Sequence, residues 1–205
     1  MAAPPQKSRL SFDRPLVTVD VVIFTVRDGQ LQVLLVQRPA GAAEPFPGAW
    51  ALPGGFIDVH LERTLLACAR RKLKEKTGVT TPYLEQLGSW GNATRDPRGW
   101  SATHAYVALI PLPAPAHAAG EAVQQWVAVD DALRRKLAFD HGDILESGVG
   151  RLRSKVEYTS LPAFLLSLRR LIPKQLYPVA QHKRTYRPSL QLALHLLKQS
   201  DNQGQ

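Results

Sequence analysis

A disulfide framework is excluded at once, because this chain of 205 residues contains a single cysteine, Cys68. Cys68 stands among apolar positions of a helical pattern, so we expect a small buried core residue rather than a nucleophile. Long hydrophobic runs are also missing, and the first residues lack the apolar centre of a signal peptide. With 44% hydrophobic residues, the chain can bury a full core, and we expect a soluble cytoplasmic protein with no membrane partner.

Acidic residues are scarce in the last quarter of the chain. Residues 151–205 contain ten lysines and arginines but only two acidic residues, so they carry +8 of the overall charge of +9. The earlier residues are therefore almost neutral. A basic segment of this kind suits contacts with nucleic-acid phosphates, although a basic tail also serves solubility alone. The DNA-binding candidates in it are Lys174, Lys183, Arg184 and Arg187.

Hydrophobic patterning predicts strands around one strongly helical stretch. Apolar, β-branched runs predict strands at 16–26 and 31–36, joined by a turn at Asp28-Gly29, and further strands near 83–90, 101–110 and 124–129. Between 133 and 157 the composition turns helical, which predicts a connecting helix or a helix pair. This order gives an α+β fold, with a flexible N-terminus at 1–14, a ligand domain at 15–140, and a linker helix with a smaller, mostly helical basic region at 141–205.

The most specific pattern is Leu52-Pro-Gly-Gly-Phe56 followed by Arg71-Lys-Leu-Lys-Glu-Lys-Thr-Gly78. It resembles the Nudix box, a Gly-rich turn and a helix ending in Arg-Glu-apolar-x-Glu-Glu-x-Gly-apolar. In that box, glutamates three and four residues apart share one helical face, where they suit Mg²⁺ that bridges to substrate phosphates. Here Lys72 and Lys76 occupy the places of the first and last glutamates, so Glu75 alone is left of that cluster.

The two lysines predict a change in chemistry. Each exchange of Glu for Lys places an ammonium within roughly 5–6 Å of the metal position, which costs a divalent ion several kcal/mol at an effective dielectric of about 20. We therefore expect weak Mg²⁺ binding at Glu75, if any, and no required cofactor. No catalytic residue is expected in the degenerate box formed by Gly55, Glu62, Arg71, Lys72, Glu75 and Lys76.

The lysines have two possible roles at this point. They form the solvated face of an amphipathic helix whose Leu65, Leu66, Ala69 and Leu73 are buried, or they bind the diphosphate of a ligand without a metal. Two residues more separate Gly55 from Gly78 than the box allows, so we assign Glu62 no metal. Arg71 and Glu75 lie one helical turn apart, and we expect them to form an ion pair.

Further motifs extend the resemblance over residues 16 to 160. They are Val33-Leu-Leu-Val-Gln-Arg38, Trp50-Ala-Leu-Pro-Gly-Gly-Phe-Ile57, Tyr83-Leu-Glu-Gln-Leu87, Arg95-Asp-Pro-Arg-Gly-Trp100 and Leu137-Ala-Phe-Asp-His141. Together they resemble the Nudix-related transcriptional regulators of NAD metabolism. The resemblance implies a Nudix-type α/β/α sandwich that has generally lost catalysis and binds ADP-ribose or a related nucleotide. It also implies a C-terminal winged helix that binds operator DNA as a homodimer.

The ligand-binding candidates are Arg38, Trp50, Lys72, Lys76, Arg95 and Arg98. Arg95 and Arg98 flank Asp96-Pro97, a geometry in which guanidiniums suit a diphosphate or a ribose edge; the alternative is a turn stabilised by Asp96. Trp50 either stacks an adenine or packs against the fold. The histidines show no metal-ligand spacing, and we interpret them as structural or surface residues.

The C-terminal residues depart from a winged helix. They predict helices at 161–171 and 188–198 separated by two prolines, without a convincing wing, which indicates a degenerate or truncated domain. Three hypotheses follow: a ligand-responsive transcriptional regulator of NAD metabolism, a Nudix hydrolase that uses Mg²⁺ to cleave ADP-ribose or another nucleoside diphosphate derivative, and a ligand-binding module that no longer binds DNA. The operator, the ligand and the direction of control stay open.

Overall fold

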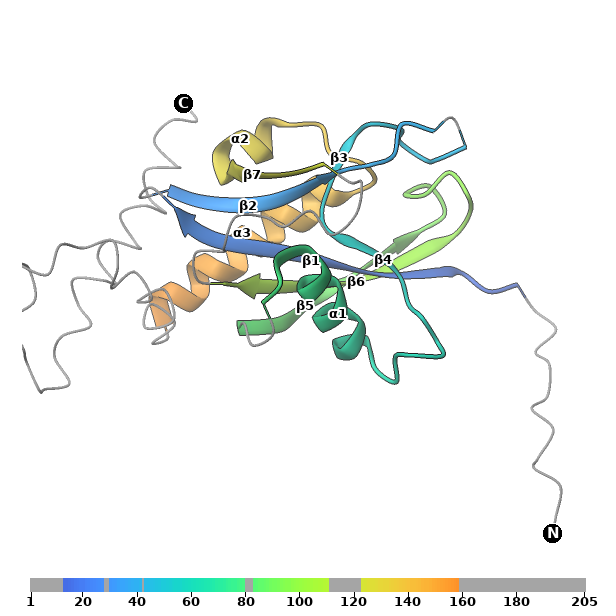
Figure 1. The fold of residues 1–205 in the computed structure, drawn as a ribbon, viewed down its shortest axis with the longest axis horizontal. Helices are drawn as coiled ribbons and strands as arrows, with labels where there is room; N and C mark the ends of the chain where they lie inside the picture. The colour runs from blue at the N-terminus through green and yellow to red at the C-terminus, as the bar shows by residue number, and fades with distance from the viewer. Residues whose placement is uncertain (1–12, 28–29, 42, 80–82, 111–122, 159–205) are drawn as a thin grey trace, which may run out of the picture.

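The computed structural model describes residues 13–27, 30–41, 43–79, 83–110 and 123–158. These residues form a seven-stranded mixed sheet and three helices (Figure 1). Several sequence predictions lie outside the described residues. These are most of the N-terminal segment 1–14, the turn at Asp28-Gly29, the loop at 111–120, and the basic region after residue 158 with its candidates Lys174, Lys183, Arg184 and Arg187.

The predicted strands are all present. The sheet contains β1 (Leu16–Arg27), β2 (Gln30–Gln37), β3 (Trp50–Ala51), β4 (Gly54–Phe56), β5 (Tyr83–Asn92), β6 (Ser101–Leu109) and β7 (Gln124–Ala128). Its strand order is β3-β2-β1-β6-β5, with β4 paired to β1 and β7 paired to β2. The long central strands β1 and β6 run parallel, and the other pairs are antiparallel. The short strands β3 and β4 were not predicted.

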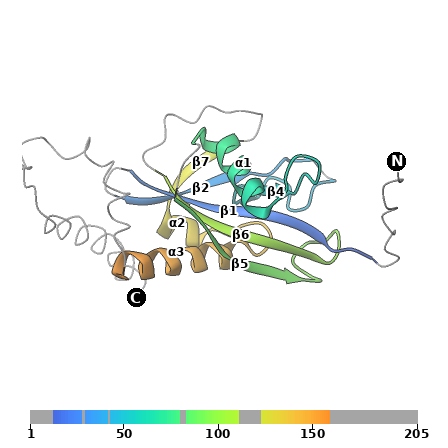
Figure 2. The same ribbon diagram turned by 90° about the horizontal axis from the view of Figure 1, so that it is seen from below.

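Helices cover both faces of the sheet, which agrees with the α/β/α sandwich that the Nudix resemblance implied. Successive side chains of a strand point to opposite faces, so Val19, Val21 and Ile23 of β1 pack against α1 (Leu65–Thr77). Val22 and Phe24 instead belong to the core beneath α2 (Val129–Arg134) and α3 (His141–Tyr158). Figure 2 shows α1 on one side of the strands and α2 with α3 on the other.

Helix α1 has defined ends. The Thr64 hydroxyl accepts a hydrogen bond from the Ala67 N–H, which satisfies one of the amides that a helix start leaves unpaired. At the other end Gly78 adopts a φ of 71° and donates to the Lys74 carbonyl, a left-handed cap that favours glycine. Cys68, Ala69 and Leu73 are buried, which confirms the core role of the cysteine. Leu65 and Leu66, which were predicted to be buried, are only half-buried; they are the first two residues of the helix and pack against the edge of the core.

The helical stretch predicted over 133–157 is mainly one helix, α3, whereas α2 begins four residues before that stretch, at Val129. Ile144, Leu145, Val149 and Leu152 of α3 are buried against the sheet. Gly148, in the same continuous helix, lies against Val22. The start of a separate region at residue 141 stays a prediction, since nothing after 158 is described. Across the described ranges, none of the helices has both the length and the apolar character needed to span a membrane.

Candidate functional site

A cavity of about 260 Å³ lies at one end of the sheet, beside the first half of β1. Strands β1 and β4, the loops before β3 and β6, and the start of α3 all contribute to its wall. The lining residues are Thr18, Asp20, Arg38, Glu44, Leu52, Gly55, Phe56, Arg95, Asp96, Arg98, Phe139 and His141. Aromatic rings and arginines in one wall suit a ligand that combines an anion with an apolar or aromatic group.

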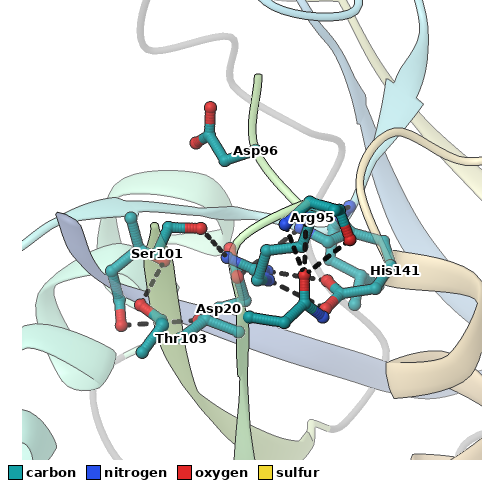
Figure 3. Close-up of polar contacts among 12 residues, drawn as sticks. Asp20, Arg95, Asp96, Ser101, Thr103 and His141 are labelled. Atoms are coloured by element: carbon teal, nitrogen blue, oxygen red, sulfur yellow. Dashed lines mark hydrogen bonds and ion pairs between the residues drawn. The ribbon is translucent and has the colours of Figure 1, made fainter. Parts of the chain in front are cut away.

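Beneath the cavity lies a group of buried polar residues, shown in Figure 3. We call it the cavity-floor cluster. Strand alternation places three of its members on the same face, because Asp20 of β1 and Ser101 and Thr103 of β6 all point toward α3. The cluster is completed by side chains from loops or helix ends, and it consists of Asp20, Arg95, Ser101, Thr103, Asp140 and His141.

Arg95 and Asp140 form the strongest ion pair of this cluster. The Arg95 Nε donates to Asp140 Oδ2 at 2.8 Å and Nη2 donates to Oδ1 at 2.7 Å, while Nη1 donates to the Ser101 hydroxyl at 3.2 Å. Burial alone would lower the pKa of the Arg95 guanidinium, but the hydrogen bonds and charge of Asp140 outweigh it and hold the pKa above its ordinary value. Arg95 therefore uses each of its three nitrogens within the protein.

His141 connects the cluster to the Gly-rich turn. Its Nδ1 accepts the Leu52 N–H at 2.9 Å, so its Nε2 carries the proton that faces Asp20 Oδ2 at 3.5 Å. Burial by itself would raise the pKa of Asp20, but His141, Thr103 and the Arg95 charge together outweigh burial and hold the pKa below its ordinary value. The carboxyl therefore stays ionised. His141 is thus structural, as predicted, although it also supports the cavity.

Gly54 is required by the same cluster. A Cβ at this position would lie 1.7 Å from Asp20 Oδ1, inside any possible contact distance. The glycine therefore leaves room for the buried carboxylate of its pairing partner Asp20, beside which β4 lies in the sheet. This gives the Pro-Gly-Gly turn a structural reason that does not involve a metal.

Two further arginines line the upper part of the cavity. The Arg98 Nε and Nη2 donate to the two oxygens of Asp96, and the Arg98 guanidinium lies 5.2 Å from the centre of the Phe56 ring. Asp96 also accepts the Arg98 N–H, so the turn stabilised by Asp96 is present. Arg38 donates to Glu44 at 2.9 Å. Every arginine of the cavity therefore has a carboxylate partner.

A second polar group lies on α1 and the segment before it, and we call it the helix cluster: Glu62 precedes the helix, and Arg71, Lys72 and Glu75 belong to it. Arg71 donates from Nε to Glu62 and from Nη1 to Glu75 at 2.8 Å, which confirms the predicted pair of Arg71 and Glu75. Glu62 also accepts the Asp58 N–H at 2.7 Å. The hydrogen bond from Arg71 is the main reason why the pKa of Glu62 falls to about 2. Both carboxylates are thus occupied by Arg71.

Lys72 extends from this helix toward the cavity. A Cβ built on Gly55, which lines the cavity, would lie 2.9 Å from Lys72 Nζ, so the ammonium rests against the turn. Lys76 lies one helical turn further along and belongs to the last turn of α1. Neither lysine is among the lining residues. Their ligand contacts stay predictions, and Lys72 is the better placed of the two.

Trp50 packs rather than lining the cavity. It lies partly buried against the core under α3, with the Arg135 guanidinium 5.7 Å from its ring centre. Of the predicted ligand residues, the cavity wall thus brings together Arg38, Arg95 and Arg98. Trp50, Lys72 and Lys76 lie outside its lining.

The side chains present do not fit a magnesium site. Glu62 and Glu75 are held by Arg71, and the Lys72 ammonium lies beside the Gly-rich turn. Mg²⁺ prefers a set of oxygen ligands without a nearby cation. Within the described ranges, no three His, Cys, Asp or Glu side chains come together in a way that could hold a metal ion.

Sequence reasoning missed several residues of the site. They are Asp20, Glu44, Ser101, Thr103, Phe139 and Asp140. One signal was available, since Asp20 is the only charged residue in an otherwise apolar, β-branched strand interior. A buried carboxylate needs partners, but the sequence could not show that they come from positions as distant as Arg95 and His141.

The chain is similar to a known domain family and to two characterised proteins. The family model described as NUDIX domain matches residues 16–147. The ADPR responsive transcriptional repressor NtrR of Acinetobacter baylyi is 48% identical over 162 residues, covering 78% of this chain and 64% of the repressor. The chain thus spans less than two thirds of that relative. An ADP-ribose pyrophosphatase of Methanocaldococcus jannaschii is 31% identical over 132 residues, covering 64% of this chain and 72% of the enzyme.

Solved structures of Shewanella oneidensis NrtR are similar as well. Its NUDIX domain in complex with ADP ribose is 44% identical, with a TM-score of 0.62, and the match covers 69% of this chain and 91% of that domain. NrtR in complex with a 27mer DNA is 37% identical, with a TM-score of 0.65, and the match covers 86% of this chain and 83% of that one.

Proposed function

This chain belongs to the NUDIX domain family, and we propose that it is a ligand-responsive transcriptional regulator of NAD metabolism. Its ligand is ADP-ribose or a related nucleotide, and its ligand domain lacks catalysis. The observation that carries the proposal is the combination of a 48% identical ADP-ribose-responsive repressor with an arginine-lined cavity, among the described residues, in place of a metal site.

The cavity supports the choice of ligand. Arginine presents N–H groups in a planar fork that matches the oxygens of a phosphate. Arg38 and Arg98 line the cavity at its wall, and Lys72 rests against Gly55 at its edge. A diphosphate bound by these groups would need no bridging metal, so the regulator requires no cofactor. Arg95 acts differently: it positions the floor through Asp140.

DNA is the proposed second partner. The net charge of +8 on residues 151–205 suits contacts with phosphates, and a similar protein has been solved with DNA. We place the DNA contacts at Lys174, Lys183, Arg184 and Arg187, in a degenerate or truncated winged helix. A homodimer would present two such regions to the two half-sites of an operator. A regulator of this kind works in the cytoplasm.

Titration of ADP-ribose into the purified full chain tests the proposal. We expect calorimetric binding that is the same with and without excess Mg²⁺, and no AMP in the same samples afterwards. A parallel filter-binding measurement with duplex DNA at two salt concentrations should show a steep loss of affinity, because released counterions drive phosphate contacts. Absence of binding to ADP-ribose refutes the sensor, and a flat salt dependence refutes the DNA contacts.

A working hydrolase is the second candidate, favoured by the 31% identity to an ADP-ribose pyrophosphatase. It would release AMP only when Mg²⁺ is present. It would also need a metal site rebuilt from Asp58, Glu62 or Glu75, and therefore independent of the lysines. The double variant Lys72→Glu with Lys76→Glu should then change AMP release only modestly. If the chain is a sensor, we expect the natural chain to release little AMP, so there is no appreciable activity for the variant to change.

A further inference from the structure

The arginine–carboxylate pairs around the cavity differ in how firmly they are held. Arg95 and Asp140 share two hydrogen bonds, and their side chains are only 3% and 14% exposed. Arg98 and Asp96 also share two; the Asp96 side chain is 3% exposed, whereas the Arg98 side chain is 38% exposed. Separating either pair is costly, because a buried charge, the Arg95 guanidinium or the Asp96 carboxylate, would be left without its partner. These two pairs therefore persist when a ligand enters.

The pair of Arg38 and Glu44 is different. It has one hydrogen bond, of 2.9 Å, and the Glu44 side chain is 44% exposed. An exposed ion pair of this kind contributes little to stability, and the freed carboxylate can be solvated at once. Glu44 also lies near the other cavity arginine, since after Asp96 its charge helps to raise the pKa of Arg98. Glu44 thus lines the same cavity as both arginines, and its carboxylate is bonded to one of them.

Arg38 does not depend on Glu44 for its position. Its Nε donates to the Pro45 carbonyl at 2.6 Å, and its guanidinium lies 4.9 Å from the centre of the Phe139 ring. The same ring packs against Phe46, with 4.7 Å between the ring centres, so the loop is fixed just after Glu44. If the Glu44 side chain rotates away, the contacts with Pro45 and Phe139 keep the guanidinium in the cavity wall, and the Nη2 that bonded Glu44 becomes available to a ligand. A preorganised donor of this kind loses little entropy on binding.

We propose that Glu44 is a specificity-determining residue, which occupies Arg38 until the diphosphate of a nucleotide ligand displaces it. A diphosphate carries more charge than one carboxylate and can accept two parallel N–H bonds from a guanidinium. It therefore replaces Glu44, whereas an uncharged nucleoside does not. The inference deepens the proposed function, because it assumes ADP-ribose as the ligand of this cavity. In this role, Glu44 selects for ligands whose negative charge at Arg38 is greater than that of one carboxylate.

The variant Glu44→Gln tests this role while leaving Arg38 with its Pro45 contact. Calorimetric titrations use ADP-ribose, inorganic pyrophosphate and adenosine on the full chain. We expect the Kd of ADP-ribose and of pyrophosphate to fall about two- to fivefold, the range that corresponds to loss of an exposed ion pair. Adenosine binding should not change. A thermal melt verifies that the variant is folded.

The matched control is Asp131→Asn. It removes the carboxylate of another exposed arginine pair, Arg134 with Asp131 on α2, which is not part of the cavity. It makes the same change in net charge, so its Kd values should equal those of the natural chain. In the background of Arg38→Gln, the effect of Glu44→Gln should disappear, because the two residues act on one another.

The outcomes separate the two levels of the proposal. If the natural chain binds ADP-ribose but Glu44→Gln matches Asp131→Asn, the role of Glu44 is wrong and the proposed function stands. The role of Glu44 is also wrong if the variant changes adenosine binding as much as it changes ADP-ribose binding. If ADP-ribose is not bound, the proposed function fails, and pyrophosphate still reports on Glu44. If neither anion is bound by any of the chains, both are refuted.

Discussion

The helix cluster and the cavity-floor cluster contain the same kinds of groups, but their central arginines differ in exposure. In the helix cluster, Arg71 is 30% exposed and bridges Glu62 and Glu75 at the surface of α1. In the cavity-floor cluster, Arg95 is 3% exposed and is bound by Asp140 beneath the cavity. The Nudix box, which carries the metal ligands in the resemblance, corresponds to the helix cluster. The arginine that is buried and has several partners is instead in the cavity-floor cluster.

The difference shows how a family fold can keep its form after its metal ligands change. At the helix, Lys72 and Lys76 stand at positions where the Nudix box has glutamates, and the two carboxylates there both pair with Arg71. The cavity floor cannot change so easily, because each charge there is desolvated and depends on the others. We therefore expect mutations in the two clusters to differ sharply in their effect on stability.

The largest effect is expected for Asp140→Ala. It leaves the Arg95 guanidinium buried without its main partner, and removal of one member of a buried ion pair costs about 3–5 kcal/mol. Urea denaturation of the variant and the natural chain measures the loss in the free energy of unfolding. The double variant Arg95→Met with Asp140→Leu should recover much of it, because no charge is then left buried. A loss below about 1 kcal/mol for Asp140→Ala would show that water reaches Arg95 and that the floor is not desolvated.

The cavity floor also shows what the sequence could not predict. The long strands followed from apolar, β-branched runs, and the burial of Cys68 followed from its helical neighbours. The pair of Arg71 and Glu75 followed from their spacing of one helical turn. Each of these depends on residues that are close in the chain. By contrast, Arg95, in the loop between β5 and β6, meets Asp140, 45 residues later in the chain, only because the fold brings the start of α3 back to this end of the sheet.

Two kinds of information were missing from the sequence. Strands β3 and β4 contain two and three residues, too few for any alternation to be visible. Arg95 was predicted to bind a ligand because it stands in a loop beside Asp96-Pro97, and nothing near it in the sequence revealed its partner Asp140. A position in a loop suggests that an arginine is accessible to a ligand. Only the fold shows whether its guanidinium is already paired with a carboxylate of the protein.

An intermediate effect, with a characteristic pH dependence, is expected for Glu62→Gln. The pKa of Glu62 is about 2 in the folded chain against an ordinary value of 4.5. Because the folded pKa is lowered, the ionised carboxylate stabilises the fold fully above pH 4.5, and this stabilisation is lost as the pH falls from 4.5 toward 2. Urea denaturation of both chains from neutral pH down to about pH 3 measures the difference.

That difference should be largest near neutral pH and should shrink steadily below pH 4.5. The buried carboxyls Asp20 and Asp96 also have lowered pKa values, but they are present in both chains and cancel in the difference. A difference that is constant over the whole range would mean that Glu62 acts through its packing and not through its charge. The helix cluster would then resemble the cavity floor more closely than its exposure indicates.

The smallest effect is expected for Glu75→Gln. Glu75 is 45% exposed and pairs with Arg71 one helical turn away, and such surface pairs contribute about 0.3–0.5 kcal/mol. Arg71 keeps its hydrogen bond to the buried Glu62, so no charge loses its last partner. Urea denaturation beside Glu146→Gln, an exposed position of α3, separates loss of the pair from loss of a surface charge. A cost above about 1.5 kcal/mol would contradict the comparison, because it would make the helix cluster a cooperative network. A cost in the expected range instead leaves this face of α1 nearly neutral to substitution, which is how lysines could replace glutamates there without loss of the fold.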